Sequence, residues 1–298
     1  MDFLALLVGC FREGGQPALS IQYITFDPPE DGLPWISRIS YSDWSHGHNH
    51  ILHCHEDTAE ILLILHGRGS YTVGLHRAEV EAGDVVLTGC GVPHDEFPQT
   101  NELYQTLCLG ICGLVLPGRE AGKFVEASRS PVFHRPAQFL ELAALGGIIR
   151  RHGEARQAYD DVLCQHAARS VLALAAQMTA EAEGQPLSGQ AVLIARLEDY
   201  IGGHYTEDLT IDRLSRKFYI SPYYLSHLFK ERTGYSLKQY ILRRRIGEAQ
   251  TRLYTTRDSV QQIAADMGFE DAAYFSRIFT KYVGLPPVEY RKLMNVTL

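Results

Sequence analysis

The sequence predicts an α+β protein of two domains: a small antiparallel β-barrel of the jelly-roll type with a helical extension, then an all-α domain with two helix-turn-helix units. Three observations lead to this fold class. Short segments rich in valine, isoleucine, leucine and tyrosine alternate with turn residues from Ile21 to Phe133. Helical periodicity replaces them from Pro136 onward. The C-terminal third contains an internal repeat.

The strands expected in the barrel are short and are separated by turns that contain glycine. Clear examples are Glu60–Leu65, Gly69–Leu75 and Asp84–Thr88. Many short strands at close spacing are typical of barrels and sandwiches built from antiparallel sheets. The N-terminal domain is therefore expected to be mainly β.

Two helices are expected to follow the barrel. In the first, Phe139, Leu142 and Ala143 share one helical face, and in the second the apolar positions are Val162, Leu163, Val171, Leu174 and Met178. An unpartnered stripe on the second helix predicts a homodimer formed through the segment 159–178, and packing of the stripe on the chain's own barrel is the alternative. The stripe consists of Val162, Leu163, Val171 and Leu174.

A change of composition separates the two domains. Residues 183–191 have the glycine, proline and serine content of a linker, and helical periodicity resumes after them. The predicted domains are therefore 1–182 and 192–298, joined by the linker 183–191.

The repeat in the second domain has an offset of 50 residues. Leu225, Ser226, Leu228, Phe229, Gly234 and Tyr240 correspond to Phe275, Ser276, Ile278, Phe279, Gly284 and Tyr290. At an offset of 49, Ile211, Leu214 and Phe218 correspond to Val260, Ile263 and Met267. Each copy is therefore expected to be a short helix, a turn and a second helix.

Capping residues delimit these helices in both copies. Ser221 precedes Pro222 at the start of one helix, and Ser259 with Gln262 has the spacing of a capping box. Gly234 and Gly284 are placed where the two second helices must end in a left-handed residue. Both copies are therefore predicted as helix-turn-helix units.

The second helix of each unit leaves a polar face free, because its apolar residues occupy a single stripe. The outward positions are Tyr223, Ser226, His227 and Lys230 in the first unit and Ala273, Ser276, Arg277 and Lys281 in the second. Such side chains can reach base edges in a major groove of double-stranded DNA, and Arg277 suits bidentate pairing with guanine. A solvated helix face is the alternative, which the repetition of the unit disfavours.

A connecting helix is expected from Leu237 to about Leu253, roughly 25 Å long at 1.5 Å per residue. It would hold the two recognition helices about one DNA turn, ~34 Å, apart. Four arginines on it are expected to contact phosphates, with ordinary surface exposure as the alternative. They are Arg243, Arg244, Arg245 and Arg252.

Residues 195–293 resemble the DNA-binding domain of the AraC/XylS family of bacterial regulators. The first copy matches through 209–210, 221–230 and 233–234, and the second through 263–264, 268–271, 274–279 and 284–290. The resemblance implies promoter recognition by the helices Tyr223–Glu231 and Ala272–Lys281, and transcription activation with RNA polymerase as a partner. Thr280 departs from the family, which usually has lysine there.

The N-terminal half carries a histidine cluster in the pattern Gly47-x5-His53-x-His55-x4-Glu60-x6-Gly67. This pattern resembles the first cupin motif, and 83–94, ending in His94, resembles the second, with Gly89 in place of proline and Pro98 in place of asparagine. On a strand His53 and His55 share a face. The cupin fold would bring Glu60 and His94 to the same point inside the barrel.

Two interpretations of this cluster stay open. Three imidazoles and a carboxylate suit a divalent metal such as Zn, Fe, Ni or Mn. The same side chains also suit a polar pocket for the hydroxyls of a small-molecule effector, above all a sugar. His46, His48 and His50 add histidines nearby. Cys54 and Cys90 are expected on the outer face, because neighbouring strand positions point in opposite directions.

Composition and charge fit a regulator of this kind. The chain has 298 residues, 45% hydrophobic and 21% charged, with a net charge of −7. Residues 1–191 carry −11 and residues 192–298 carry +4, so only the C-terminal domain is suited to phosphates. The apolar run 3–10 follows Asp2 and is too short for a membrane span, which predicts a cytoplasmic chain without a membrane partner. The six cysteines match no zinc pattern.

We therefore expect a ligand-responsive transcription regulator, in the activator role, that controls carbohydrate-related genes. Domain 1–182 would bind the effector and dimerise, and domain 192–298 would bind DNA. The effector or metal residues would be His53, His55, Glu60 and His94. The alternatives are a metal- or redox-responsive regulator that uses the same four residues, and a metal-dependent cupin enzyme, against which the fused DNA-binding domain argues.

Overall fold

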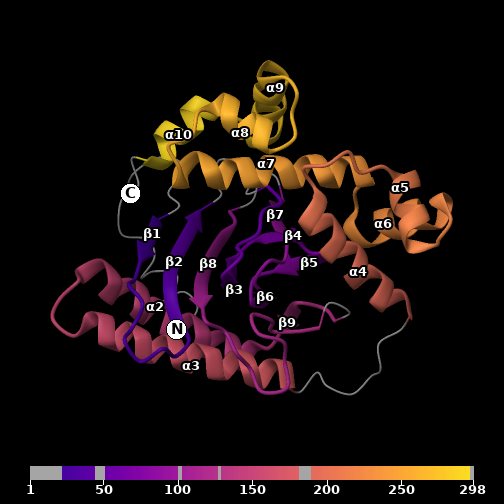
Figure 1. Ribbon diagram of the computed structural model, residues 1–298. Helices are drawn as coiled ribbons and strands as arrows, with labels where there is room; N and C mark the ends of the chain where they lie inside the picture. The colour runs from indigo at the N-terminus through magenta and orange to yellow at the C-terminus, as the bar shows by residue number, and fades with distance from the viewer. Residues whose placement is uncertain (1–21, 44–50, 100–102, 127–128, 181–188, 296–298) are drawn as a thin grey trace.

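The computed structural model describes residues 22–43, 51–99, 103–126, 129–180 and 189–295 (Figure 1). The predicted apolar run 3–10, the histidines at 46, 48 and 50, and most of the predicted linker lie outside these residues. The helix α4 begins at Gly189, inside the predicted linker 183–191. The boundary between the two domains stays a prediction.

Nine strands make up the N-terminal domain among the described residues. They are β1 (Gln22–Thr25), β2 (Trp35–Asp43), β3 (Thr58–His66), β4 (Arg68–Val73), β5 (His76–Glu81), β6 (Asp84–Thr88), β7 (His94–Pro98), β8 (Gln105–Cys112) and β9 (Val132–His134). The three strands expected from sequence correspond to β3, β4 and β6.

The strands pair in two antiparallel sheets. Six strands form one sheet in the order β1-β2-β8-β3-β6-β9, and three form the other in the order β5-β4-β7. The predicted cupin-like β-domain is thus present, but within the described strands the ladder hydrogen bonds do not close into one continuous barrel. Strand β7 is an edge strand beside β4. A single bridge between His53 and His94 joins β7 to the loop before β3.

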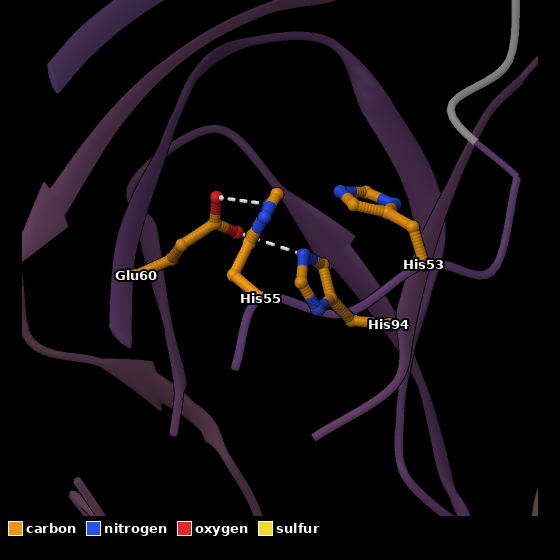
Figure 2. Close-up of side chains that lie close together, drawn as sticks. All are labelled: His53, His55, Glu60 and His94. Carbon is orange, nitrogen blue, oxygen red and sulfur yellow. Dashed lines mark ion pairs between the residues drawn. The ribbon is translucent and has the colours of Figure 1, made fainter. Parts of the chain in front are cut away.

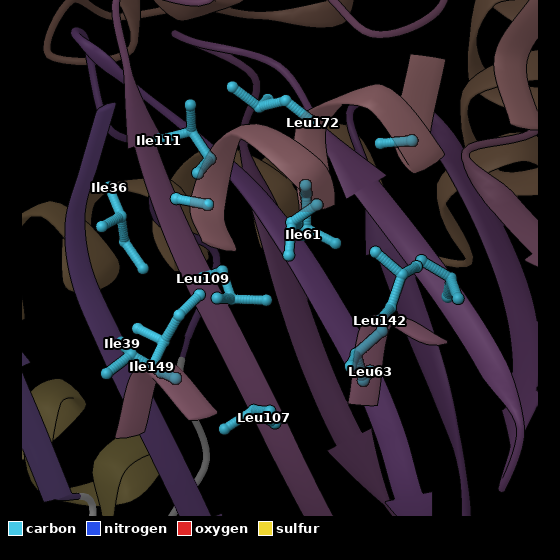
Figure 3. Packing of buried hydrophobic residues seen from close by; sticks show 14 of the residues in the cluster. Ile36, Ile39, Ile61, Leu63, Leu107, Leu109, Ile111, Leu142, Ile149 and Leu172 are labelled. Atoms are coloured by element: carbon cyan, nitrogen blue, oxygen red, sulfur yellow. The ribbon is translucent and has the colours of Figure 1, made fainter. Parts of the chain in front are cut away.

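Two helices cover the outer face of the six-stranded sheet, α2 (Pro136–Ala155) and α3 (Asp160–Ala180) (Figures 1 and 3). The main core lies between them and the sheet. It contains Ile61, Leu63, Leu107 and Leu109 from the strands, and the predicted helical residues Phe139, Leu142 and Ala143 pack against these. Burial of these apolar side chains stabilises the layer arrangement, by about 1.5–3 kcal/mol for each large side chain.

The prediction that the four apolar residues of the second helix form one stripe is wrong. Val171 is fully buried in the core, whereas Val162 and Leu163 are exposed, at 55% and 42%. Leu174 is half-buried beside the core. The error has a simple cause: residues nine apart, such as Val162 and Val171, are 180° apart on a helix with 100° per residue, so they face opposite sides.

The C-terminal domain consists of helices in two helix-turn-helix units around a long central helix. The elements are α4 (Gly189–His204), α5 (Ile211–Phe218), α6 (Pro222–Thr233), α7 (Leu237–Thr255), α8 (Val260–Asp266), α9 (Ala272–Val283) and α10 (Pro287–Asn295). Helix α7 corresponds to the predicted connecting helix, and α6 and α9 to the predicted recognition helices. Figure 1 shows α7 lying across one end of the strands, with α8, α9 and α10 on its other side.

Residues of the N-terminal domain complete both cores of the helical domain. Leu52 and Leu75 pack in the cluster of the first unit with Leu225 and Phe229. Ile51 packs in the cluster of the second unit with Phe275. The two domains are therefore docked along α7. Among the described helices, none combines the length and apolar character needed to cross a membrane.

Candidate functional site

The two recognition helices are defined by local capping. The Ser221 hydroxyl accepts a hydrogen bond from the backbone N–H of Tyr224 at 3.1 Å, with Pro222 at the start of α6. Asp271 caps α9 by accepting from the backbone N–H groups of Ala273 and Tyr274. Both helices end at glycines with positive φ, Gly234 at 74° and Gly284 at 87°. These caps set where each helix begins and ends.

The predicted DNA-contacting residues lie on the outer faces of these helices. Tyr223, Ser226, His227 and Lys230 are exposed on α6, and Ala273, Arg277 and Lys281 lie on the corresponding face of α9. Ser276 is half-buried, and its hydroxyl donates to the Ala272 carbonyl at 2.9 Å. The free faces are small, polar and cationic, which suits contact with a major groove. Their role in DNA binding stays a prediction.

The prediction that the arginines of α7 contact phosphates is wrong for the docked chain. Arg243 and Arg244 are buried, at 7% and 2% exposure. Arg245 donates to the backbone carbonyls of Tyr205, Glu207 and Gly268. Arg252 pairs with Asp258 and Asp266 at 2.7 and 2.6 Å. Each of these guanidinium groups is thus engaged with acceptors supplied by the fold.

The four predicted effector or metal residues converge in the N-terminal domain (Figure 2). One nitrogen of each of His53, His55 and His94 and one oxygen of Glu60 all lie within 4.8 Å of one another. His94 Nε2 lies 2.8 Å from Glu60 Oε2, and His55 Nε2 lies 3.3 Å from Glu60 Oε1. Glu60 comes from β3, His94 from β7, and the other two from the loop before β3.

Backbone carbonyls orient two of the imidazole rings. His53 Nδ1 lies 3.1 Å from the carbonyl oxygen of Ile51, and His94 Nδ1 lies 3.0 Å from that of Val92. Since a carbonyl can only accept, each Nδ1 carries the proton and each Nε2 is directed elsewhere. This arrangement is common for metal-ligating histidines.

The charges around Glu60 favour its ionised form. Burial alone would raise the pKa of Glu60, but His94, Arg38 and His55 together hold it well below its ordinary value. Arg38 on β2 forms an ion pair with Glu60. Burial lowers the pKa of His55, assisted by the charge of Arg38, which favours a neutral imidazole. A carboxylate thus faces three imidazoles in a site shielded from water.

This donor set fits a divalent metal. His94 Nε2 is buried without a hydrogen-bond partner although it approaches the Glu60 carboxylate, so a second ring proton or a cation is needed to join the two. Nitrogen and oxygen ligands of this kind suit Zn, Fe, Ni or Mn. Arg38 already supplies one positive charge to Glu60, which also allows the site to work without a metal.

The four residues line a cavity of about 240 Å³. Hydroxyl groups of Ser40, Ser42 and Thr106 line the same cavity, together with the carboxyl group of Glu96, whose pKa burial raises to about 8. The wall is completed by side chains of α7, namely Thr251, Tyr254 and Thr255. A small polar molecule in this cavity would therefore be surrounded by both domains.

Several of these residues were not found from sequence. Arg38 follows no motif, and its position opposite Glu60 depends on the pairing of β2 with β8 and of β8 with β3. Tyr254 lies in the other domain and reaches the cavity only through docking. Cys54, which was expected on an outer face, does point away from the histidines, but its thiol is buried against the guanidinium of Arg244.

Comparison with known families gives two matches. The model described as "Helix-turn-helix domain" matches residues 214–293, and the model described as "Cupin domain" matches residues 42–103. The first therefore covers both recognition helices, and the second covers His53, His55, Glu60 and His94.

Similar proteins include regulators of the same overall size. The "Uncharacterized HTH-type transcriptional regulator YdiP" of Escherichia coli is 25% identical over 269 residues, which cover 87% of this chain and 86% of that protein. The "Arabinose operon regulatory protein" of E. coli is 28% identical over 162 residues, which cover 53% and 54%. A single-substitution variant of ToxT from Vibrio cholerae, solved in its apo form, has a TM-score of 0.48 and 15% identity, covering 86% and 97%.

Proposed function

The chain belongs to the AraC/XylS family of transcription regulators, and we propose that it is a DNA-binding regulator whose DNA affinity responds to a small molecule bound in the N-terminal domain. One observation gives this proposal its main support. A domain with two capped helices that expose polar and cationic faces is docked against a 240 Å³ cavity lined by polar side chains. Membership of a regulator family also supports a non-enzymatic role.

DNA binding is assigned to the outer faces of α6 and α9. The contacting residues are Tyr223, Ser226, His227, Lys230, Ala273, Ser276, Arg277 and Lys281. The test is the affinity of the full chain for a duplex selected from a random library, measured at several salt concentrations. Lysine and arginine contacts release counterions, so the affinity is expected to fall steeply as salt rises. An affinity that does not change with salt would contradict the assignment.

The effector is assigned to the cavity, and a sugar is the class we propose. Hydroxyls, imidazoles and carboxylates line the cavity, and these groups can donate to and accept from the several hydroxyls of a monosaccharide. The name of one similar protein, the arabinose operon regulatory protein, connects it with a sugar. Control of carbohydrate-related genes, as an activator that acts with RNA polymerase in the cytoplasm, completes this proposal.

A second candidate effector is a divalent metal. The observation that favours it is the geometry of the four side chains. The Nδ1 atoms of His53 and His94 are bonded to backbone carbonyls, and one ligand atom of each of the four residues lies within 4.8 Å of the others. His53, His55, Glu60 and His94 would hold the ion, which would act as the signal. Coordination would add charge and rigidity to the cavity.

Two measurements separate the candidates. Metal analysis of protein prepared without chelators or an affinity tag gives stoichiometric metal if the ion is the effector. A thermal-shift screen of monosaccharides, with L-arabinose among them, gives stabilisation if the effector is a sugar, because a ligand that binds only the folded state raises its stability. In either case His94→Ala is expected to abolish the response while the DNA-binding domain remains folded. A normal response in His94→Ala would contradict the assigned site.

Dimerisation is proposed through the outer faces of α2 and α3. Leu145, Ala173 and Leu174 line a groove between these helices, and Val162 and Leu163 are exposed further along α3. Apolar groups on the surface of a helical layer suit a self-complementary contact. Sedimentation of the full chain tests the proposal, and a chain that sediments as a monomer would contradict it.

A further inference from the structure

The segments that carry the histidines also hold helix α7. In both segments, a residue next to a cavity histidine contacts α7. His53 and His55 face the cavity, whereas Cys54 between them contacts Arg244 of α7. On β7 the His94 ring faces the other histidines, and the next residue, Asp95, forms an ion pair with Arg243 of α7 at 3.1 Å. Each segment therefore joins the effector site to α7 through adjacent residues.

The two segments are also joined to each other. His53 N donates to the His94 carbonyl at 3.0 Å, and His94 N donates to the His53 carbonyl at 2.8 Å. β7 has β4 as its strand neighbour on one side and this bridge on the other. Because an edge strand is held by fewer ladder hydrogen bonds, β7 is the histidine-bearing strand of the cavity wall that can shift when the imidazoles change partners.

Arg243 lies where three parts of the protein meet. Its guanidinium is within 4.5 Å of the ring centroid of Phe97 on β7 and 5.0 Å of that of Tyr235, which precedes α7. It is 5.4 Å from the ring centroid of Tyr282 on the second recognition helix α9. Asp95 is fully buried and Arg243 nearly so. Three aromatic faces and one carboxylate thus fix this cation.

Further contacts keep α7 close to the loop of the histidines and to the turn between β4 and β5. The backbone N–H of Ile51 donates to Gln250 Oε1 at 3.2 Å, and the Tyr240 hydroxyl donates to the Gly74 carbonyl at 3.3 Å. Gly247 allows the closest approach, because a Cβ there would lie 2.1 Å from the Leu52 carbonyl oxygen. The helix that connects the two DNA-binding units is therefore in direct contact with the loop that carries His53 and His55.

We propose that the Asp95–Arg243 ion pair is the element that transmits the state of the effector site to the two recognition helices. A change at His94 displaces β7, and Asp95 carries the displacement to Arg243. Arg243 contacts the end of the first helix-turn-helix unit through Tyr235 and the second recognition helix through Tyr282. The inference rests on the proposed function, in which effector binding changes DNA affinity. The coupling between His94 and α7 is a property of the full chain and can be measured without ligand or DNA.

The test is hydrogen exchange of the α7 amides in the full chain, for a double-mutant cycle of His94→Ala and Arg243→Gln. Each single variant is expected to speed exchange in α7 at least fivefold. The double variant is expected to exchange no more than twofold faster than Arg243→Gln alone, because the signal from His94 requires the arginine. His134→Ala is the matched control: His134 on β9, at the edge of the six-stranded sheet, pairs with Asp84, and its removal is expected to leave exchange in α7 unchanged.

The outcomes are separable. The proposal is overturned if His94→Ala leaves the exchange rates of α7 within twofold of wild type. It is also overturned if the effects of the two substitutions on these rates multiply, as independent effects would. Should His94→Ala not fold, as judged by near-ultraviolet circular dichroism, His94→Gln replaces it in the same cycle, since the amide keeps a polar side chain. A wild-type chain that binds no duplex would contradict the proposed function instead, and the exchange comparison would still decide the coupling.

Discussion

Replacing Gly247 by alanine tests whether the two domains are docked in solution. In an undocked helix, alanine is favoured over glycine by about 0.5–1 kcal/mol, because it restricts the unfolded backbone. In the docked chain the new Cβ would lie 2.1 Å from the Leu52 carbonyl oxygen and 2.5 Å from that of Ile51. Both neighbours are backbone atoms, so no side-chain rotation can relieve the contact.

The magnitude follows from these two opposing effects. Overpacking of a well-packed interior costs about 1–3 kcal/mol, which exceeds the gain in helix propensity. Gly247→Ala is therefore expected to lower the free energy of unfolding by about 1–2 kcal/mol. Gly202→Ala in α4 is the matched control, since a Cβ there meets nothing within 4 Å, and it is expected to stabilise the chain by up to about 1 kcal/mol.

Urea unfolding followed by far-ultraviolet circular dichroism gives both free energies, and hydrogen exchange at 51–54 reports the docking contact directly. Destabilisation by Gly247→Ala with faster exchange at 51–54 is the expected result. The reasoning would be refuted if Gly247→Ala stabilised the chain as Gly202→Ala does, because α7 would then have no backbone neighbour in solution.

Three further predictions concern DNA, assembly and pH. Arg277→Ala is expected to cost about 1–3 kcal/mol of DNA-binding free energy and to relax the preference at one base position. Binding to duplexes varied at single positions measures this, and an equal loss of affinity for all duplexes would make Arg277 a phosphate contact. Leu174→Glu is expected to convert a dimer to a monomer in sedimentation, and a wild-type monomer would contradict dimerisation through α3. Burial raises the pKa of Glu198 from 4.5 to about 7, against the opposing charge of Lys123, so the folded state binds its proton more tightly than the unfolded state does. The free energy of unfolding should therefore fall as pH rises from about 4.5 through 7. The expected fall is about 1–2 kcal/mol, since partial exposure of the side chain weakens the effect. Glu198→Gln should remove this dependence on pH.

The local features of the helical domain were predictable because they depend on short stretches of chain. Ser221, Pro222 and Gly234 act on neighbouring backbone groups, so the bounds of α6 follow from a few adjacent residues. The same holds for Ser259, which accepts from the Gln262 N–H as its spacing indicates. The repeat supplied independent support, since both units end with the same kind of glycine.

The histidine site was predictable for a different reason. His53 and His55 lie in the loop before β3 and not on the expected strand, but both line the cavity as their spacing indicates, and the resemblance to the cupin motifs supplied the long-range pairing with Glu60 and His94. The structure brings all four together. Arg38 was missed because its approach to Glu60 is a consequence of strand order, which places β2 and β3 on either side of β8.

The sequence alone determined the types and order of the elements and the two helix-turn-helix units, since spacing and capping are local, and the resemblance to the cupin motifs identified the four side chains of the site. Only the tertiary structure decided which arginines are buried with partners inside the protein. Arg243 looks like a phosphate contact beside two other arginines, yet its partner Asp95 lies 148 residues earlier. Burial depends on such distant partners, and no local pattern encodes them. For the same reason docking decided that α7 of the DNA-binding domain forms part of the effector cavity.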